Sequence, residues 1–127
     1  TPDARLLFIS TSEVYGPPEK LPVDESHPLN PKNPYAISKA EADRYCQKIH
    51  AETGMNIVRM RPFNHSGSGQ ADSFVLSSFA RQIAEMESGI QEPVMRVGNL
   101  EAARDFTHVD DIVRAHAPAP GGALGAP

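Results

Sequence analysis

Leu6-Leu-Phe-Ile-Ser-Thr-Ser-Glu-Val-Tyr-Gly16 begins with four consecutive apolar residues and ends on a glycine. A short continuous apolar run is typical of a strand that is buried on both faces of a parallel sheet. The segment after it is rich in proline, so it is predicted to be a surface loop rather than helix or central strand. Its prolines stand at positions 17, 18, 22, 28 and 31.

A long helix is predicted after this loop. Asn33-Pro34 has the pattern of an N-cap followed by proline at the first helical position. The helix is expected to run to about Thr53 and to stop at Gly54 in the left-handed conformation. A second strand follows at Asn56-Ile-Val-Arg-Met-Arg-Pro62. A strand, a helix and a strand in this order predict a βαβ unit with a right-handed crossover, and therefore an α/β fold with a parallel sheet.

The rest of the chain predicts shorter elements. A Gly/Ser loop is expected over residues 64–72, a helix over 73–88 ended by Gly89, short strands over 94–97 and 105–108, and a helix beginning over 109–115. From residue 117 the chain contains only Ala, Pro, Gly and Leu, and this tail, 117–127, is expected to be disordered.

Composition limits the possible functions. The 127 residues fit one domain, and the net charge of −4 argues against general nucleic-acid binding, which usually needs a basic face. The single cysteine, Cys46, rules out an internal disulfide framework and suits a reducing compartment, so the cytoplasm is expected. No apolar run is long enough for a membrane span. The histidines show no convincing metal-ligand spacing, and no metal site is predicted.

The first turns of the long helix carry Tyr35 and Lys39. Positions i and i+4 are neighbours on a helix, so the ammonium can favour the ionised form of the phenol and make it a general acid/base for a ketone or an alcohol. At 3.6 residues per turn both side chains fall on one stripe with Ala42, Cys46 and Ile49, which predicts that they face the sheet. The alternative is a tyrosine that packs at the helix end beside a lysine whose ammonium reaches solvent.

Ser10-Thr11-Ser12 directly follows the first predicted strand. Open parallel sheets bind ligands at the carboxyl ends of their strands, so a hydroxyl here is placed to hydrogen-bond the carbonyl oxygen that Tyr35 addresses. The alternative is that these residues form an ordinary turn or cap.

Taken together, four motifs resemble the extended short-chain dehydrogenase/reductase family, the branch of nucleotide-sugar epimerases, dehydratases and reductases. They occur in the family's order: Ser10-Thr-Ser-Glu-Val-Tyr-Gly16, Asn33-Pro-Tyr-Ala-Ile-Ser-Lys39, Arg61-Pro-Phe-Asn64 and Arg104-Asp-Phe-Thr-His-Val-Asp-Asp111. The segments 61–70 and 97–106 are most similar to GDP-4-keto-6-deoxy-D-mannose reductases, and next to GDP-mannose 4,6-dehydratases. The resemblance implies the carboxyl-terminal part of a Rossmann-like doubly wound parallel sheet and an NADP or NAD cofactor.

The resemblance also implies roles for individual residues. Thr11, Tyr35 and Lys39 match the catalytic set: Tyr35 would be the acid/base, Lys39 would bind the nicotinamide ribose, and Thr11 would hold the substrate oxygen. Phe63 matches a position whose backbone meets the cofactor.

Substrate contacts are implied in the same way. Ser12 and Glu13 would lie at the sugar, and Asn64 and Arg104 match positions that contact the nucleotide-sugar diphosphate, for which a guanidinium is chemically suited. Arg81, on the second helix, is a further candidate for a phosphate or base contact.

Glu13 bears on which reaction is expected. In the dehydratases a glutamate in the matching segment acts as the base that removes a proton next to the transient ketone. Acidic residues at this position also resemble some reductases, however. The dehydratases tend to carry an arginine pair in the loop after Asn-His and a tryptophan after Arg-Asp, whereas this chain has Ser68-Gly69-Gln70 and Phe106. Reduction of a GDP-linked 4-keto-6-deoxy hexose is therefore favoured over dehydration of GDP-mannose.

Two family features are not found in this sequence: the glycine-rich phosphate turn and the acidic ribose contact that begin a dinucleotide-binding fold. The chain also begins without methionine. Residues 1–116 are therefore expected to be part of an NAD(P)-binding domain, inactive alone and unable to bind NADPH, with an apolar strand edge exposed. The longer protein is expected to be a homodimer. A non-catalytic nucleotide-sugar-binding module is the alternative, although such a module has no reason to keep Thr11, Tyr35 and Lys39.

Overall fold

The computed structural model of the protein describes residues 4–117. These residues divide into a first unit that ends at Phe63 and a second unit that runs from Asn64 to Ala117. The disordered tail predicted for residues 117–127 lies outside the described residues apart from Ala117. None of the helices within residues 4–117 is long and apolar enough to cross a membrane.

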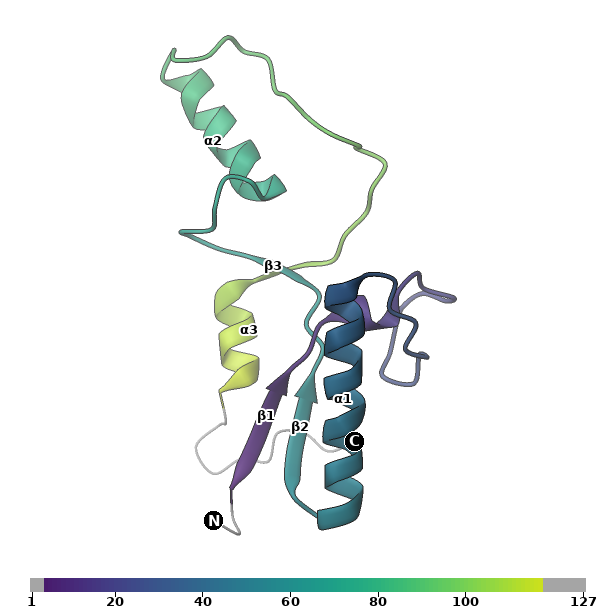
Figure 1. The fold of residues 1–127 in the computed structure, drawn as a ribbon. Helices are drawn as coiled ribbons and strands as arrows, with labels where there is room; N and C mark the ends of the chain where they lie inside the picture. Colours follow the sequence, from purple (N-terminus) through teal and green to yellow (C-terminus); the bar gives the residue numbers. More distant parts are fainter. Residues whose placement is uncertain (1–3, 118–127) are drawn as a thin grey trace. The chain divides into compact units, whose positions relative to one another are not determined.

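The first unit is a βαβ arrangement, as predicted. It consists of β1 (Arg5–Ile9), a short 3-10 helix η1 (Ser12–Tyr15), the long helix α1 (Pro34–Thr53) and β2 (Asn56–Met60). β1 and β2 pair in parallel, from Arg5 opposite Asn56 to Ile9 opposite Met60. Figure 1 shows α1 running alongside the two strands, and it packs against β2. The expectation of an α/β fold with a parallel sheet is confirmed.

Both ends of α1 lie where the sequence predicts them. At the start, Asn33 has extended backbone and its Oδ1 accepts a hydrogen bond of 2.8 Å from the Ala36 N–H. At the end, Gly54 has φ = +70° and donates to the His50 carbonyl at 2.9 Å. An amide side chain satisfies a free N–H at the first turn, and a left-handed glycine ends the last turn without a side-chain penalty.

The buried face of α1 agrees only in part with the predicted one. The fully or nearly fully buried residues of the helix are Ala36, Ala40, Asp43 and Cys46. Tyr35 is 52% exposed, so the prediction that it faces the sheet is wrong. Of the predicted stripe, Cys46 is buried and Lys39, Ala42 and Ile49 are half-buried, so the buried face includes part of that stripe and extends to Ala36, Ala40 and Asp43.

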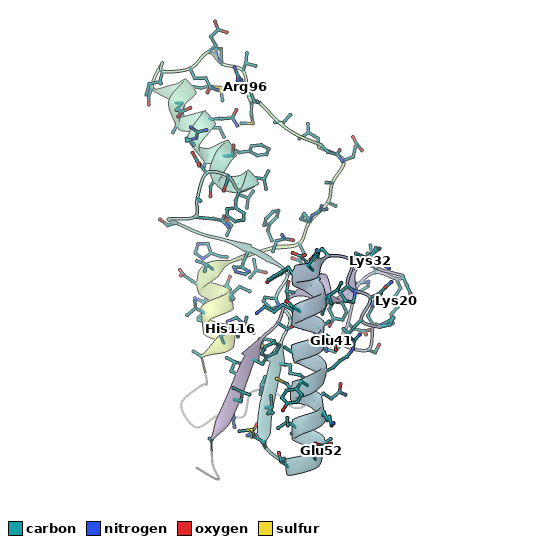
Figure 2. All side chains as sticks on the ribbon, viewed as in Figure 1. Lys20, Lys32, Glu41, Glu52, Arg96 and His116 are labelled. Carbon is teal, nitrogen blue, oxygen red and sulfur yellow. The ribbon has the colours of Figure 1, made fainter. Side chains whose placement is uncertain are left out.

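The segment between β1 and α1 packs through a small core of its own. Val14, Tyr15 and Ala40 are buried together, and Val23 and Leu29 pack against them from the proline-rich loop. Figure 2 shows Lys20 and Lys32 on this loop, where both are exposed. The proline-rich stretch is therefore a surface loop, as predicted, but one that is attached to α1 through apolar contacts.

The strands of the first unit are only partly covered. Among the described residues β1 pairs with β2 alone. Leu6 and Ile9 remain 42% and 37% exposed. The predicted apolar exposure along this strand is confirmed, whereas burial on both faces of β1 is not found within residues 4–117.

The second unit contains β3 (Asn64–Ser66), α2 (Val75–Glu87), β4 (Phe106–His108) and α3 (Val109–His116). β3 and β4 pair in parallel, and α3 packs against both. Residues 64–66 were expected to be loop, and this is wrong because pairing with β4 makes them a strand.

The strand predicted for residues 94–97 is also wrong, since these residues have no regular structure. The polar backbone groups of Arg96 bond instead to the Gln82 side chain of α2. Arg96 N donates to Gln82 Oε1 at 2.7 Å, and Gln82 Nε2 donates to the Arg96 carbonyl at 3.1 Å. A side-chain amide thus satisfies the two groups that a neighbouring strand would otherwise pair with.

Candidate active site

The side chain of Lys39 reaches the carboxyl end of β1. Its Nζ donates a hydrogen bond of 2.9 Å to the carbonyl of Ile9, the last residue of that strand. The ammonium also lies 5.5 Å from the centre of the Phe8 ring, within the range of a cation–π contact. The lysine is therefore held at the edge of the sheet where parallel α/β folds bind their ligands.

Tyr35 lies one helical turn before Lys39, in the first turn of α1. Its side chain is 52% exposed, so a bound molecule can reach the hydroxyl without displacing the protein core. Because a helix places residues i and i+4 on the same side, Tyr35 and Lys39 leave α1 on the same side.

The Ser10-Thr11-Ser12 segment continues the pairing of β1 beyond the strand. Ser10 N donates to the Met60 carbonyl at 2.7 Å, and Ser12 N donates to the Pro62 carbonyl at 3.0 Å. Thr11 caps η1, since its Oγ1 accepts a hydrogen bond of 3.3 Å from the Glu13 N–H. The hydroxyls thus follow the carboxyl end of β1, as expected. Thr11 is also a helix cap, which was the alternative interpretation of this segment.

Glu13 is connected to the start of α1. Its Oε2 accepts a hydrogen bond of 2.9 Å from Nδ2 of Asn33, the residue that caps the helix through its Oδ1. One asparagine side chain therefore orients the Glu13 carboxylate and fixes the first turn that carries Tyr35. The sequence identifies Asn33 as a cap, but this second contact was missed because it joins residues from different elements.

A buried ionic cluster joins α1 to the end of β2, and the sequence did not predict it. Asp43 on α1 is fully buried and accepts hydrogen bonds from Arg59 and Arg61 at 2.7–2.8 Å. Burial alone would raise the pKa of Asp43, but the hydrogen bonds and charges of Arg61 and then Arg59 outweigh it, so the pKa is lowered. The hydrogen bond to Asp43 is the main cause that raises the pKa of Arg61 above its ordinary value.

The remaining sequence-predicted residues lie later in the chain. Phe63 is the last residue of the first unit and is 37% exposed. Asn64 and Arg104 belong to the second unit, where Asn64 pairs with Phe106 at the start of the β3–β4 sheet. Arg104 stands two residues before Phe106, so both candidates lie at the amino end of this sheet, and Arg104 is exposed.

The guanidinium of Arg81 is paired with carboxylates of the protein itself. It forms ion pairs with the exposed Asp72 at 3.2 Å and with the half-buried Glu85 at 3.4 Å. Its suggested contact with a phosphate or base therefore gains no support from the structure. Among residues 4–117, no group of three or more His, Cys, Asp or Glu side chains is arranged to hold a metal ion.

The residues at the end of β1 are chemically suited to a nicotinamide nucleoside. The Lys39 ammonium at the strand end has N–H groups that can donate to ribose hydroxyls, and the phenol of Tyr35, one helical turn earlier, is half-exposed. Ser10 Oγ adds a buried hydroxyl that has no hydrogen-bond partner within residues 4–117. These groups fit one end of a dinucleotide, whereas no glycine-rich phosphate turn follows β1.

Known proteins are similar to this chain in sequence and in fold. The family model described as GDP-mannose 4,6 dehydratase matches residues 1–119. A GDP-6-deoxy-D-mannose reductase from Pseudomonas aeruginosa is 43% identical over 112 residues, which cover 87% of this chain and 37% of that protein. A GDP-mannose 4,6-dehydratase from Yersinia enterocolitica is 32% identical over 110 residues, covering 87% of this chain and 29% of that protein.

The structural comparison agrees with the sequence comparison. The solved structure of RMD from Pseudomonas aeruginosa, complexed with NADPH, superposes with a TM-score of 0.79 at 43% identity and covers 86% of this chain and 38% of that one. The chain thus spans about a third of the length of the relatives that it matches. Because the family model matches almost the whole chain, the protein belongs to the GDP-mannose 4,6-dehydratase family, within the extended short-chain dehydrogenases/reductases.

Proposed function

We propose that the protein carrying this chain is an NAD(P)H-dependent reductase of a GDP-linked 4-keto-6-deoxy hexose, most simply GDP-4-keto-6-deoxy-D-mannose. The observation that carries the proposal is the position of Lys39, whose ammonium bonds the last carbonyl of β1 while Tyr35 stands exposed one turn before it. The 43% identity to a GDP-6-deoxy-D-mannose reductase supports the same substrate class. We propose in addition that the protein is a homodimer and that it acts in the cytoplasm.

When bound, the reduced nicotinamide supplies a hydride to the carbonyl carbon of the keto sugar. In this proposal Tyr35 donates the proton that the carbonyl oxygen gains, so the ketone becomes an alcohol and the phenolate is left beside the Lys39 ammonium. Thr11 donates a hydrogen bond to the same oxygen and orients it. Lys39 holds the nicotinamide ribose, and the Phe63 backbone contacts the cofactor.

Substrate binding is assigned in this proposal to four further residues. Ser12 and Glu13 are proposed to contact the sugar, since both follow the carboxyl end of β1. Asn64 and Arg104 are proposed to contact the diphosphate. An exposed guanidinium can donate several N–H groups to phosphate oxygens, which supports Arg104 in this role.

A second candidate reaction is dehydration of GDP-mannose. The observation that favours it is the hydrogen bond from Asn33 to Glu13, because a carboxylate that is oriented at the site can remove a proton next to a transient ketone. The 32% identity to a GDP-mannose 4,6-dehydratase supports this alternative less strongly than the reductase.

The two reactions differ in their use of cofactor, which gives the test. Purified full-length protein is incubated with NADPH and GDP-4-keto-6-deoxy-D-mannose, and separately with NADP and GDP-mannose. A reductase consumes NADPH in stoichiometric amounts with the keto sugar, whereas a dehydratase converts GDP-mannose with no net change in cofactor. Tight binding of both nucleotide sugars without turnover of either would instead show a non-catalytic binding module.

A further inference from the structure

Asp43, Arg59 and Arg61 form a charged cluster inside the first unit, and the proposed reaction does not use it directly. Asp43 lies on α1 four residues after Lys39 and is fully buried. Arg59 is in β2 and Arg61 follows that strand directly. The side chains of these arginines are 28% and 13% exposed. The cluster therefore joins the helix that carries Tyr35 to the end of β2.

The contacts within the cluster are directional. Arg61 binds Asp43 in a bidentate manner, with Nε to Oδ2 and Nη2 to Oδ1, both at 2.8 Å. Arg59 Nη1 adds a bond of 2.7 Å to the same Oδ1. A forked pair of this kind fixes the angle between the two groups as well as their distance, which apolar packing does not.

Arg61 also contacts η1, through the nitrogen that does not bond Asp43. Arg61 Nη1 donates to the Tyr15 hydroxyl at 3.0 Å, and the guanidinium also lies 5.2 Å from the centre of the Tyr15 ring. Tyr15 is the last residue of η1 and only 4% exposed. His27 packs edge-on against its ring, with the ring centres 5.6 Å apart.

We infer that Asp43, Arg61 and Tyr15 are positioning residues for the reaction proposed above, on which this inference rests. Their hydrogen bonds join η1, which carries Ser12 and Glu13 and is capped by Thr11, to α1, which carries Tyr35 and Lys39. The chain of bonds runs from Tyr15 Oη through the Arg61 guanidinium to the Asp43 carboxylate. None of the three side chains needs to touch a reacting atom.

The free-energy cost of burying charges argues that this cluster has a role besides stabilising the fold. Burying ions is costly, and a well-packed apolar cluster is often as stable, so stability alone gives weak grounds for the arrangement. Catalysis, in contrast, is sensitive to small displacements, since a shift of about 1 Å in a reacting group can cost about 100-fold in rate. The cluster restrains the two elements whose relative placement the reaction requires.

The test uses Tyr15→Phe in the full-length protein, because this change removes only the hydroxyl and keeps the ring in the core. We expect kcat for keto-sugar reduction to fall about 10- to 100-fold. KM for the nucleotide sugar should rise less than kcat falls, because Asn64 and Arg104, which are proposed to bind the diphosphate, do not belong to η1. Amide hydrogen exchange should become faster at residues 12–15. Tyr45→Phe, at an exposed tyrosine of α1, is the matched control and should change neither quantity.

Arg61→Lys is the second variant, since it keeps the charge but loses the fork and should reproduce the fall in kcat. An unchanged kcat together with unchanged exchange at residues 12–15 in Tyr15→Phe would overturn the inference. So would an equal loss of kcat in Tyr45→Phe. A parent protein that turned over no nucleotide sugar would count against the proposed function, and faster exchange in Tyr15→Phe would then still support the connection between η1 and α1.

Discussion

Asn33 Nδ2 donates a hydrogen bond of 2.9 Å to Glu13 Oε2, while Asn33 Oδ1 accepts one of 2.8 Å from the Ala36 N–H. A single amide side chain thus orients a carboxylate and caps the helix that presents Tyr35. The two functions of Asn33 use different atoms, so they can be separated by mutation.

Asn33→Asp should separate them. Aspartate caps a helix about as well as asparagine, so the capping contribution is kept, and loss of the exposed hydrogen bond to Glu13 should lower the free energy of unfolding by only about 1 kcal/mol. A second carboxylate repels Glu13, and kcat should fall by about 10-fold if Glu13 must be oriented. Thermal unfolding and steady-state kinetics measure the two effects. Asn30→Asp, at an exposed asparagine of the same loop, is the control. Full activity in Asn33→Asp would show that the reaction does not need an oriented Glu13.

Lys39→Met should affect activity much more than stability. The hydrogen bond to the Ile9 carbonyl is lost, which should cost about 1 kcal/mol of unfolding free energy. The contact proposed with the nicotinamide ribose is also lost, so KM for NADPH should rise and kcat should fall. Lys48→Met is the matched control, because Lys48 is on the same helix and forms only an exposed ion pair with Glu52 at 3.7 Å. Equal effects of the two substitutions on KM and kcat would show that Lys39 is not part of the active site.

Gly16→Ala should strongly destabilise the protein. Gly16 ends η1 with φ = +66° and ψ = −153°, and an added Cβ would lie 2.0 Å from the Asn30 carbonyl oxygen. The backbone conformation alone costs about 1–3 kcal/mol for a non-glycine residue, and the contact with backbone adds to that cost.

Gly54→Ala is the control for this substitution. Gly54 also has a positive φ, +70°, but no atom lies within 4 Å of the added Cβ. Its cost should be about 1–2 kcal/mol. Urea unfolding compares the two variants, and a Gly16→Ala protein as stable as Gly54→Ala would contradict the close approach of Gly16 to the loop.

Asp43 should contribute to the pH dependence of stability. Its folded pKa is lowered from the ordinary value of 3.8, so its ionised form stabilises the folded state. This stability is fully present above the unfolded pKa and is lost as the pH falls through the folded pKa. Asp43→Asn should cost about 3–5 kcal/mol at neutral pH and make the loss of stability below about pH 4 less steep.

Asp24→Asn serves as the comparison for the acid range. Hydrogen bonds from Ser26 lower the pKa of Asp24, which lies in the exposed loop. Its removal should alter the acid transition far less than removal of Asp43, because solvent screens exposed charges. Unfolding free energies measured across the acid range would contradict the account if Asp24→Asn had the larger effect.

The sequence alone predicts the first unit well because its signals are local. The apolar run of β1, the Asn33 cap, the Gly54 stop and the β2 strand each depend on residues that are close in the chain, and all four are found. The position of the Ser10, Thr11 and Ser12 hydroxyls directly after β1 also follows from the local sequence.

The errors arise where distant contacts override local pattern. Residues 94–97 look like a strand, but the Gln82 side chain satisfies the backbone of Arg96 instead. No local pattern predicts that Asp43 is buried, because its partners, Arg59 and Arg61, lie 16 and 18 residues later in the chain. Asp43 is buried together with Ala36, Ala40 and Cys46, whereas Tyr35 is 52% exposed.

In the function that we propose, Tyr35 is the acid/base of a nicotinamide-dependent reduction. The most direct measurement is the rate of NADPH oxidation by the full-length protein with GDP-4-keto-6-deoxy-D-mannose, compared between the parent, Tyr35→Phe and the control Tyr45→Phe. We expect Tyr35→Phe to lower kcat by about 100- to 10,000-fold with thermal stability retained, and Tyr45→Phe to match the parent. A Tyr35→Phe protein that reduced the keto sugar at the parent rate would contradict the claim.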